Sequence, residues 1–447
     1  MAVIKPFRAV RYNPEKVADL SKVMAPPYDV ISQEFKEELH RRHPNNIIRL
    51  ILGKTHDTSD DSLYEKARCY LEEWLKEGIL IRDDKPALYP YTQTYRVDGN
   101  LVTRTGFIGL ARLEEPGEGG IKPHERTLSG PKADRLKLLT ACEANLSCIF
   151  SLYPEDGDNP QEKNINSLME ETLKTPPIAE AIDDDGVIHR LWKIDDPETI
   201  RAITSKMQNK ELFIADGHHR YETALRYRQM MLEKTPNPTG EEPFNYVMMY
   251  FTSMADPGLL IFPTHRVVHS LEDFNKDHLI EECRKYFQIE ELPFEDATEE
   301  SVKKEFLEKL KEGSDEKIKF GLYVRNNPVY YILTFKGKEV MDALFGSSMA
   351  DVHKALDVTV LHSVILEKIL GIDREAQEGG KNLTYIKDAE EALKATKSGD
   401  NQLLFLMNPT RIEDIRKVSD AGLLMPQKST YFYPKLISGL TINLLKE

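Results

Sequence analysis

The feature that most constrains the fold is a short apolar run that passes directly into a helix through an Asp-Gly pair. The run Leu-Phe-Ile-Ala at 212–215 has the length of a buried strand. Asp216 and Gly217 follow, and helical spacing of apolar residues begins at once. Asp216 is expected to cap this helix, while Gly217 lets a backbone or a ligand approach closely. Such a strand–turn–helix unit, with further strands and helices along the chain, predicts an α/β or α+β fold with mixed sheets.

The beginning of this helix is a candidate anion site. The first-turn N–H groups of a helix have no partner within the helix, and the helix dipole places partial positive charge there. His218, His219 and Arg220 add donors and positive charge at the same point. Phosphate is the natural occupant of such a site. Two alternatives stay open: the histidines could merely bond backbone carbonyls, or His218 and Glu222, at i and i+4, could hold a metal ion for which no third ligand is evident.

A second segment, Lys-Pro-His-Glu at 122–125, offers acid–base chemistry. Glu125 is the candidate general base, and His124 beside it is a second candidate catalytic residue. Lys132 and Arg135 follow, and these cations would keep the glutamate ionised and bind phosphate oxygens. The structural alternative is a solvated polar loop leading into a helix.

A third segment lies near the C-terminus, in a loop bounded by prolines. Lys428 is followed by the hydroxyls of Ser429 and Thr430, and these groups could hold phosphate oxygens by charge-assisted hydrogen bonds. An ordinary surface loop is the alternative. The chain has no complete P-loop, no G-x-G-x-x-G, no G-x-S-x-G and no H-E-x-x-H pattern, which argues against the enzyme classes that those motifs mark.

Composition limits the partners and the compartment. The formal net charge of −14 over 447 residues argues against general nucleic-acid binding, although a local basic pocket is compatible with it. Four cysteines form neither a disulfide framework nor a C-x-x-C clip. No signal peptide and no membrane span is expected, and the predicted location is the cytoplasm.

The charged, glycine-rich stretch at 114–120 is the best candidate domain boundary. Three parts are expected: an N-terminal α/β domain (1–115), a phosphate-binding core (116–270), and a C-terminal α/β domain (271–447) that contributes the loop at 425–435. Whether residues 1–115 form a separate domain or pack into the same core is left open. The expected local elements in that part are an extended segment at 25–32, helices at 33–43 and 62–77, and a hairpin turn at Asp98-Gly99.

The motifs KPHE at 122–125, ADGHHR at 215–220 and PQKST at 426–430 resemble those of the free L-serine kinases in the ParB/sulfiredoxin-like superfamily. The chain as a whole is similar to a widespread family of prokaryotic proteins of about this length. Three further segments carry that second resemblance: PFRAVRYN, APPYDVIS and MPQKSTYFYPKLISGL. The third loop departs from the kinase pattern, because aromatic residues follow it where a basic residue is expected.

The resemblance implies a ParB/sulfiredoxin-like core and a kinase that uses ATP or ADP with Mg²⁺ to phosphorylate free serine or a similar hydroxyl metabolite. Glu125 would be the general base, and Asp216 would position the substrate or Mg²⁺, or serve as the base itself. The donor phosphates would be held by Gly217, His218, His219 and Arg220, with Lys132, Arg135, Lys428, Ser429 and Thr430 around them. Phosphoryl transfer needs mainly alignment and positive charge, which such a set supplies.

Two other functions stay open at this stage. The same scaffold could support a nucleotide hydrolase or a nucleotide-gated switch, in which Glu125 would activate water. A non-enzymatic DNA-partner protein of the ParB type would need a basic recognition helix, whereas the candidate helices near 275–287 and 302–311 carry mixed charge. The oligomeric state cannot be inferred from the sequence.

Overall fold

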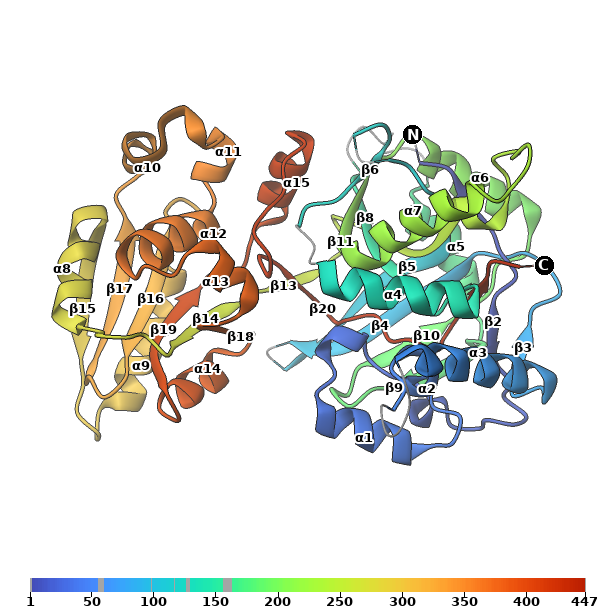
Figure 1. The fold of residues 1–447 in the computed structure, drawn as a ribbon, viewed down its shortest axis with the longest axis horizontal. Coiled ribbons are helices and arrows are strands. Elements are labelled where there is room, and N and C mark those ends of the chain that lie inside the picture. Colours follow the sequence, from blue (N-terminus) through green and yellow to red (C-terminus); the bar gives the residue numbers. More distant parts are fainter. Residues whose placement is uncertain are drawn as a thin grey trace. The chain divides into compact units, whose positions relative to one another are not determined.

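The computed structural model describes residues 2–54, 60–97, 99–115, 117–125, 129–155 and 163–446 (Figure 1). The chain divides into two units, and each contains segments that are distant in sequence. The first unit comprises Met1–Pro123, Thr127–Leu260 and Pro434–Glu447, and the second comprises His124–Arg126 and Ile261–Tyr433. The chain passes from the first unit to the second within strand β13 (Leu260–Phe262) and returns after β20 (Tyr431–Tyr433).

A nine-stranded mixed sheet forms the centre of the first unit. The β6–β11 and β8–β12 pairs are parallel, and the other neighbours are antiparallel. The strand order is β6 (Ile121–Lys122), β11 (Leu212–Asp216), β8 (Ile149–Tyr153), β12 (Tyr246–Ser253), β5 (Asn100–Arg112), β4 (Tyr89–Val97), β10 (Ile188–Leu191) and β9 (Ala179–Ile182), with β1 (Ile4–Lys5) on β5. Strands β1, β4 and β5, which come from the N-terminal part of the chain, therefore belong to the same sheet as β6, β8, β11 and β12.

The helices of the first unit agree with the periodicity of the sequence. Those predicted at 33–43, at 62–77 and directly after the Asp-Gly pair are present as α1, α3 and α7. The helices are α1 (Gln33–Arg42), α2 (Ile48–Ile51), α3 (Asp60–Lys76), α4 (Ser129–Cys142), α5 (Ile165–Leu173), α6 (Pro197–Gln208) and α7 (His218–Leu232). Two small strand pairs complete the unit: β2 (Val10–Tyr12) with β3 (Leu80–Arg82), and β7 (Ala144–Asn145) with β21 (Asn443–Leu444).

The hairpin between β4 and β5 is confirmed, with a register in which Val97 pairs with Asn100. Asp98 of the predicted turn lies outside the described residues. Gly99 has a φ of +82°, a left-handed conformation that suits glycine in a two-residue turn.

Apolar packing positions α7 on the sheet. Tyr221 and Ala224 on the buried face of the helix join one core cluster with Ile214 of β11 and Phe251 of β12. Each large aliphatic or aromatic side chain of such a cluster contributes about 1.5–3 kcal/mol on burial. Helix α4 packs beside α7 (Figure 1).

A six-stranded antiparallel sheet forms the second unit. Its strand order is β15 (Phe287–Pro293), β17 (Val329–Phe335), β16 (Lys319–Val324), β19 (Asn401–Met407), β14 (His265–His269) and β18 (Leu383–Ile386). Its helices are α8 (Lys276–Tyr286), α9 (Glu299–Lys311), α10 (Lys338–Phe345), α11 (Asp351–Lys354), α12 (Asp357–Val360), the π-helix Leu361–Ile369, α13 (Arg374–Gly379), α14 (Ala389–Thr396) and α15 (Ile412–Asp420). The expected mixed α and β fold is confirmed.

The four cysteines are free thiols, of which Cys69 is exposed and the other three are buried. Every helix among the described residues is too short or too polar to cross a lipid bilayer.

Candidate anion-binding site

The turn between β11 and α7 has the predicted strand–glycine–helix form. Gly217 is the N-cap residue and has a φ of +93°, which a side chain would disfavour. A Cβ at this position would lie 2.9 Å from Nε of Arg220, so only glycine leaves that guanidinium in place. Gly217, and not Asp216, is the N-cap residue of α7, so Asp216 does not cap the helix as expected. The Asp216 carboxylate instead binds two cations.

Asp216 lies between Arg220 and Lys435. Arg220 Nη2 donates to Oδ2 over 2.7 Å, and Lys435 Nζ donates to Oδ1 over 2.5 Å. The three side chains are only 14–16% exposed. Burial alone would raise the pKa of Asp216, but the nearby Lys435 ammonium and Arg220 guanidinium hold it well below its ordinary value. One carboxylate therefore faces two cations, which leaves positive charge in excess beside the start of α7.

Lys435 is a site residue that the sequence analysis does not identify. It lies two residues after the aromatic stretch that follows the third motif, and its partner Asp216 is far away in the chain. The resemblance to the kinases leads us to expect a basic residue directly after this motif, where Tyr431 stands. Only the fold, which returns the chain to the first unit at Pro434, shows that Lys435 supplies a cation to this site.

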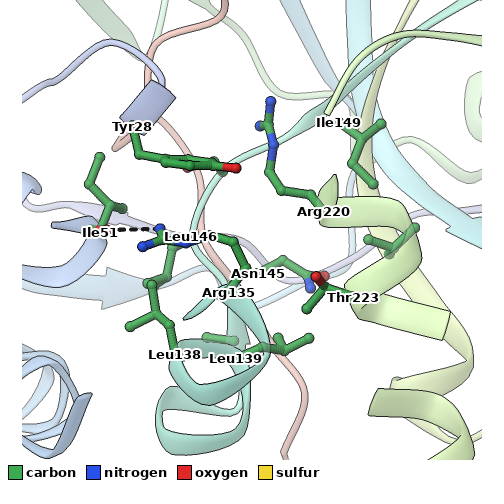
Figure 2. A pocket seen from close by; sticks show the side chains of 13 residues that line it. Tyr28, Ile51, Arg135, Leu138, Leu139, Asn145, Leu146, Ile149, Arg220 and Thr223 are labelled. Carbon is green, nitrogen blue, oxygen red and sulfur yellow. Dashed lines mark hydrogen bonds between the residues drawn. The ribbon is translucent and has the colours of Figure 1, made fainter. Parts of the chain in front are cut away.

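A small cavity of about 60 Å³ lies next to Arg220 within the first unit (Figure 2). Its volume corresponds to a few water molecules. Its lining combines polar and apolar side chains, and consists of Tyr28, Ile51, Arg135, Leu138, Leu139, Ala144, Asn145, Leu146, Ser147, Ile149, Arg220, Thr223 and Val247.

Arg135 and Tyr28 line the cavity from α4 and from the turn that follows Pro27. The guanidinium carbon of Arg135 lies 4.3 Å from the centroid of the Tyr28 ring, and Arg135 Nη1 donates to the carbonyl of Ile51 over 2.8 Å. Burial raises the pKa of the Tyr28 phenol, and the charge of Arg220 opposes that rise.

The segment at 25–32 is extended at its prolines, as expected. It then forms a 3₁₀ turn, Tyr28–Val30, because the restriction that proline places on the backbone ends at Pro27.

Thr223 presents a polar group without a partner at this cavity. Its side-chain oxygen is fully buried and has no hydrogen-bond partner among the described residues, and the residue is 4% exposed. It lies on α7 less than one turn after Arg220, and both residues line the cavity (Figure 2). Because buried hydroxyl groups are normally hydrogen-bonded, a polar ligand or a water molecule in the cavity would supply the partner of the Thr223 hydroxyl.

The other predicted residues of the first unit lie on the same two helices. His218 is buried and His219 is half-buried, both at the start of α7. Lys132 of α4 forms an ion pair with Glu222 of α7, with 2.7 Å between Nζ and Oε2. Within the described ranges, no group of three or more histidine, cysteine, aspartate or glutamate side chains could hold a metal ion. Glu222, which a metal site at His218 would need as a ligand, is bound to Lys132 in this ion pair.

His124 and Glu125 of the KPHE motif contact the PQKST loop within the second unit. Thr430 donates to Oε1 of Glu125 through both its backbone N–H (3.1 Å) and its hydroxyl (3.0 Å). The Nε2 atom of His124 lies 3.0 Å from the same hydroxyl, and this histidine is fully buried. The backbone N–H of Met425 donates to the carbonyl of His124 over 2.6 Å. The fold thus brings together segments separated by about two thirds of the chain.

The other two loop residues, Lys428 and Ser429, also have structural partners. The hydroxyl of Ser429 donates to the carbonyl of Pro426 over 2.6 Å, and Ser429 is 4% exposed. Lys428 is exposed and has a φ of +55°, and its carbonyl accepts a hydrogen bond from Arg266 over 3.3 Å. The predicted site residues therefore form two clusters, one in each unit. The first unit holds Asp216, Gly217, His218, His219, Arg220, Lys132 and Arg135, and the second holds His124, Glu125, Lys428, Ser429 and Thr430.

Comparison with known proteins gives one match at the level of sequence. A family model described as "Protein of unknown function (DUF1015)" matches residues 4–359. No curated protein matches the chain.

Several solved structures resemble the chain at low similarity. A conserved hypothetical protein from Pyrococcus furiosus is 14% identical, with a TM-score of 0.34, over 73% of this chain and 92% of its own. A free serine kinase in complex with AMP is 13% identical, with a TM-score of 0.33, over 72% and 88%. SbnI from Staphylococcus aureus, truncated at its C-terminus, is 11% identical, with a TM-score of 0.35, over 76% and 89%. Similarity of this degree does not bear on the reaction or the ligands of this chain.

Proposed function

The chain belongs to the DUF1015 family, and we propose that it is a phosphotransferase that moves a phosphoryl group from a nucleotide to the hydroxyl of a small metabolite, with free serine the first candidate acceptor. The observation that carries the proposal is the anion site at the start of α7. There the guanidinium of Arg220 and the ammonium of Lys435 outnumber the single carboxylate of Asp216. Arg135 and the unpartnered Thr223 hydroxyl line the adjacent cavity. The motif resemblance to serine kinases points to the same reaction.

The donor phosphates are proposed to bind at this site through charge-assisted hydrogen bonds and the first-turn N–H groups of α7. Phosphoryl transfer passes through a state in which negative charge spreads over the equatorial oxygens, so fixed cations stabilise it more than the ground state. Arg220 is suited to this role because its other contacts, to Asp216 and to the carbonyl of Cys148, fix its orientation.

Glu125 is proposed as the general base. Its Oε1 atom accepts both hydrogen bonds from Thr430, and no described residue donates to Oε2. In the reaction Oε2 takes the proton of the acceptor hydroxyl, and the resulting oxygen nucleophile bonds to the terminal phosphorus. The bond from that phosphorus to the bridging oxygen breaks, and the shortened nucleotide leaves with the electron pair. His124 supports this arrangement through its contact with the Thr430 hydroxyl.

Mg²⁺ does not fit Asp216 in the observed arrangement, because both carboxylate oxygens already bind cations. A magnesium ion bound to the donor phosphates would enter with the nucleotide and keep water in the rest of its shell. In this proposal Asp216, Arg220 and Lys435 act through their own hydrogen bonds and ion pairs, and none of the three is a ligand of the magnesium ion.

Calorimetric titration with ADP tests the proposed donor site. Arg220→Ala should weaken ADP binding about tenfold or more, because hydrogen bonds to charged groups contribute about 1.5–3 kcal/mol. Arg226→Ala is the matched control, since it removes the same charge from an exposed position on the same helix. Equal ADP affinity in wild type and Arg220→Ala would exclude Arg220 from the site, and absence of ADP and ATP binding to the wild type would overturn the proposed function.

A further inference from the structure

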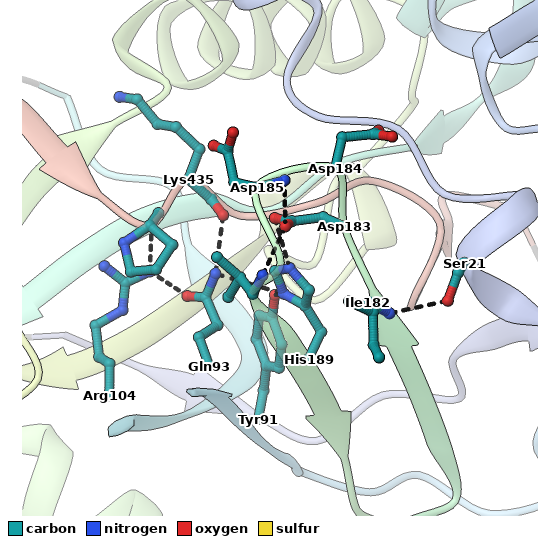
Figure 3. Close-up of polar contacts among 12 residues, drawn as sticks. Ser21, Tyr91, Gln93, Arg104, Ile182, Asp183, Asp184, Asp185, His189 and Lys435 are labelled. Atoms are coloured by element: carbon teal, nitrogen blue, oxygen red, sulfur yellow. Dashed lines mark hydrogen bonds and ion pairs between the residues drawn. The ribbon is translucent and has the colours of Figure 1, made fainter. Parts of the chain in front are cut away.

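A buried polar network holds the backbone on which Lys435 is mounted (Figure 3). Gln93 Nε2, on β4, donates to the carbonyl of Lys435 over 2.8 Å. Arg104 Nη2, on the neighbouring strand β5, donates to the carbonyl of Pro434 over 2.6 Å and also to Oε1 of Gln93. Both side chains are completely buried. Two successive carbonyls are therefore fixed by two side chains that are also bonded to each other.

A second layer of hydrogen bonds lies behind Gln93. Tyr91, on the same strand, has its hydroxyl 2.7 Å from Nδ1 of His189 on β10, and Nε2 of His189 lies 3.0 Å from Oδ2 of Asp183. Burial lowers the pKa of His189, so the ring is neutral near pH 7. The distances then assign the ring proton to Nε2, which donates to Asp183, while Nδ1 accepts from Tyr91. Gln93 packs against this assembly, with its Nε2 at 3.5 Å from Nδ1.

The position of Arg104 requires a physical reason. Moving a guanidinium from water into a protein interior is strongly unfavourable. The acceptors on Gln93 and Pro434 are neutral, while the buried carboxylate of Asp256 interacts electrostatically with Arg104. Its guanidinium carbon also lies 4.4 Å from the centroid of the Phe150 ring, a cation–π contact that offsets part of the lost hydration. An apolar residue could fill this volume, but it could not fix the carbonyl of Pro434.

The fixed segment leads directly to the anion site. The Lys435 ammonium lies 2.5 Å from Oδ1 of Asp216, and a lysine side chain loses considerable rotamer freedom when it is held in one geometry. Fixing the backbone at residues 434 and 435 limits the positions that the ammonium can reach. The hydrogen bonds of Gln93 and Arg104 therefore favour the ion pair over a solvated lysine.

We propose that Gln93 and Arg104 are positioning residues that act through Lys435. They hold the backbone of Pro434–Lys435 so that the ammonium stays beside Asp216 and the anion site keeps its second cation. The expected effect on nucleotide binding rests on the proposed function, whereas the effect on the Lys435–Asp216 ion pair does not.

A double-mutant cycle on ADP affinity tests the coupling. Gln93→Met keeps the length of the side chain and removes the hydrogen bond, and it should weaken ADP binding about fivefold, in the range of one lost hydrogen bond. Lys435→Met should weaken ADP binding about tenfold or more. The double variant should bind ADP no more weakly than Lys435→Met alone, because Gln93 acts only through the lysine. Additive losses, or an unchanged affinity in Gln93→Met, would overturn the proposal.

Tyr95→Phe is the matched control. Tyr95 lies two residues from Gln93 on β4, and its hydroxyl donates to the carbonyl of Gly258 and not to residues 434–435. This variant also removes one buried hydrogen bond from the strand, and it should leave ADP affinity unchanged. If Gln93→Met fails to fold, Gln93→Asn, which keeps the amide but shortens its reach, replaces it in the cycle.

A second measurement separates this inference from the proposed function. Carbon-13 NMR of the aspartate carboxyl groups, recorded from pH 7 to pH 4, should show no titration of Asp216 in the wild type. In Gln93→Met and in Lys435→Met, titration of Asp216 should begin at a higher pH than in the wild type, at the acid end of this window, because Arg220 remains but the ammonium no longer stabilises the charged form. An Asp216 signal that is identical in wild type and Gln93→Met would overturn the positioning role, whatever ADP binding shows.

Discussion

Asp216 illustrates how the surroundings of a motif residue decide its role. Its position before a helix predicts a capping residue, yet its carboxylate binds Arg220 and Lys435. Both cations stabilise the charged form, so the carboxylate orients the cations of the anion site and its depressed pKa keeps it ionised far into acid. The stabilisation from this depressed pKa is complete above the ordinary aspartate range and is lost only as the pH falls through the lower folded-state value.

Glu125→Gln should abolish phosphoryl transfer and leave ADP binding unchanged. The substitution keeps the size of the side chain and an acceptor for Thr430, but it removes the proton-accepting carboxylate, and general bases contribute about 10²–10⁴-fold to rate. Single-turnover transfer and calorimetric ADP titration measure the two effects separately. Glu413→Gln, at an exposed position of α15, is the control. Transfer at the wild-type rate in Glu125→Gln would assign the base to another group, with Asp216 the next candidate.

Among the elements, the β11–α7 turn depends most strongly on one residue. Gly217→Ala should destabilise the protein by about 1–3 kcal/mol, because a left-handed conformation is strained for a side chain, and it should also weaken ADP binding by displacing Arg220. Gly99→Ala isolates the backbone contribution, since Gly99 has a φ of +82° and a Cβ at that position would meet nothing within 4 Å. Denaturant unfolding and ADP titration of both variants give the comparison. Equal ADP affinity in the two variants would contradict the role assigned to Gly217.

The start of helix α12 supplies a pH-dependent effect in the second unit. Burial raises the pKa of Asp357 to about 6, above its value in an unfolded chain. The folded state then binds the proton more tightly, so this residue costs stability progressively as the pH rises from about 4 to about 6. Asp357→Asn should therefore stabilise the protein relative to wild type by an amount that grows with pH over this interval. A difference in Tm that is constant from pH 4 to pH 7 would contradict this assignment.

Sequence periodicity predicts the local elements well because their causes are local. Helix α1 ends at Arg42, shortly before Pro44, and the β4–β5 hairpin follows from alternating residues around a turn. The same reasoning could not find Lys435, Gln93 or Arg104, since their contacts join residues far apart in the chain. The sequence identifies Tyr28 only as part of an extended segment. Its role at the cavity depends on how that segment packs against α4.

At the scale of the whole molecule, the three motifs divide between two units. The KPHE motif itself spans the division, because Lys122 pairs with Phe213 in the first unit while His124 and Glu125 belong to the second. The order of the motifs along the chain predicts chemistry but gives no sign of this division. The net charge of −14 is likewise a poor guide to the local field, since cations are in excess at the start of α7.

Phosphorus-31 NMR of the purified chain with Mg²⁺ and ATP or ADP, with and without free L-serine, tests the central claim most directly. A phosphotransferase produces a new phosphomonoester signal that requires both nucleotide and serine, and Glu125→Gln removes this signal. Inorganic phosphate released at the same rate with and without serine would contradict the claim and assign the site to a nucleotide hydrolase.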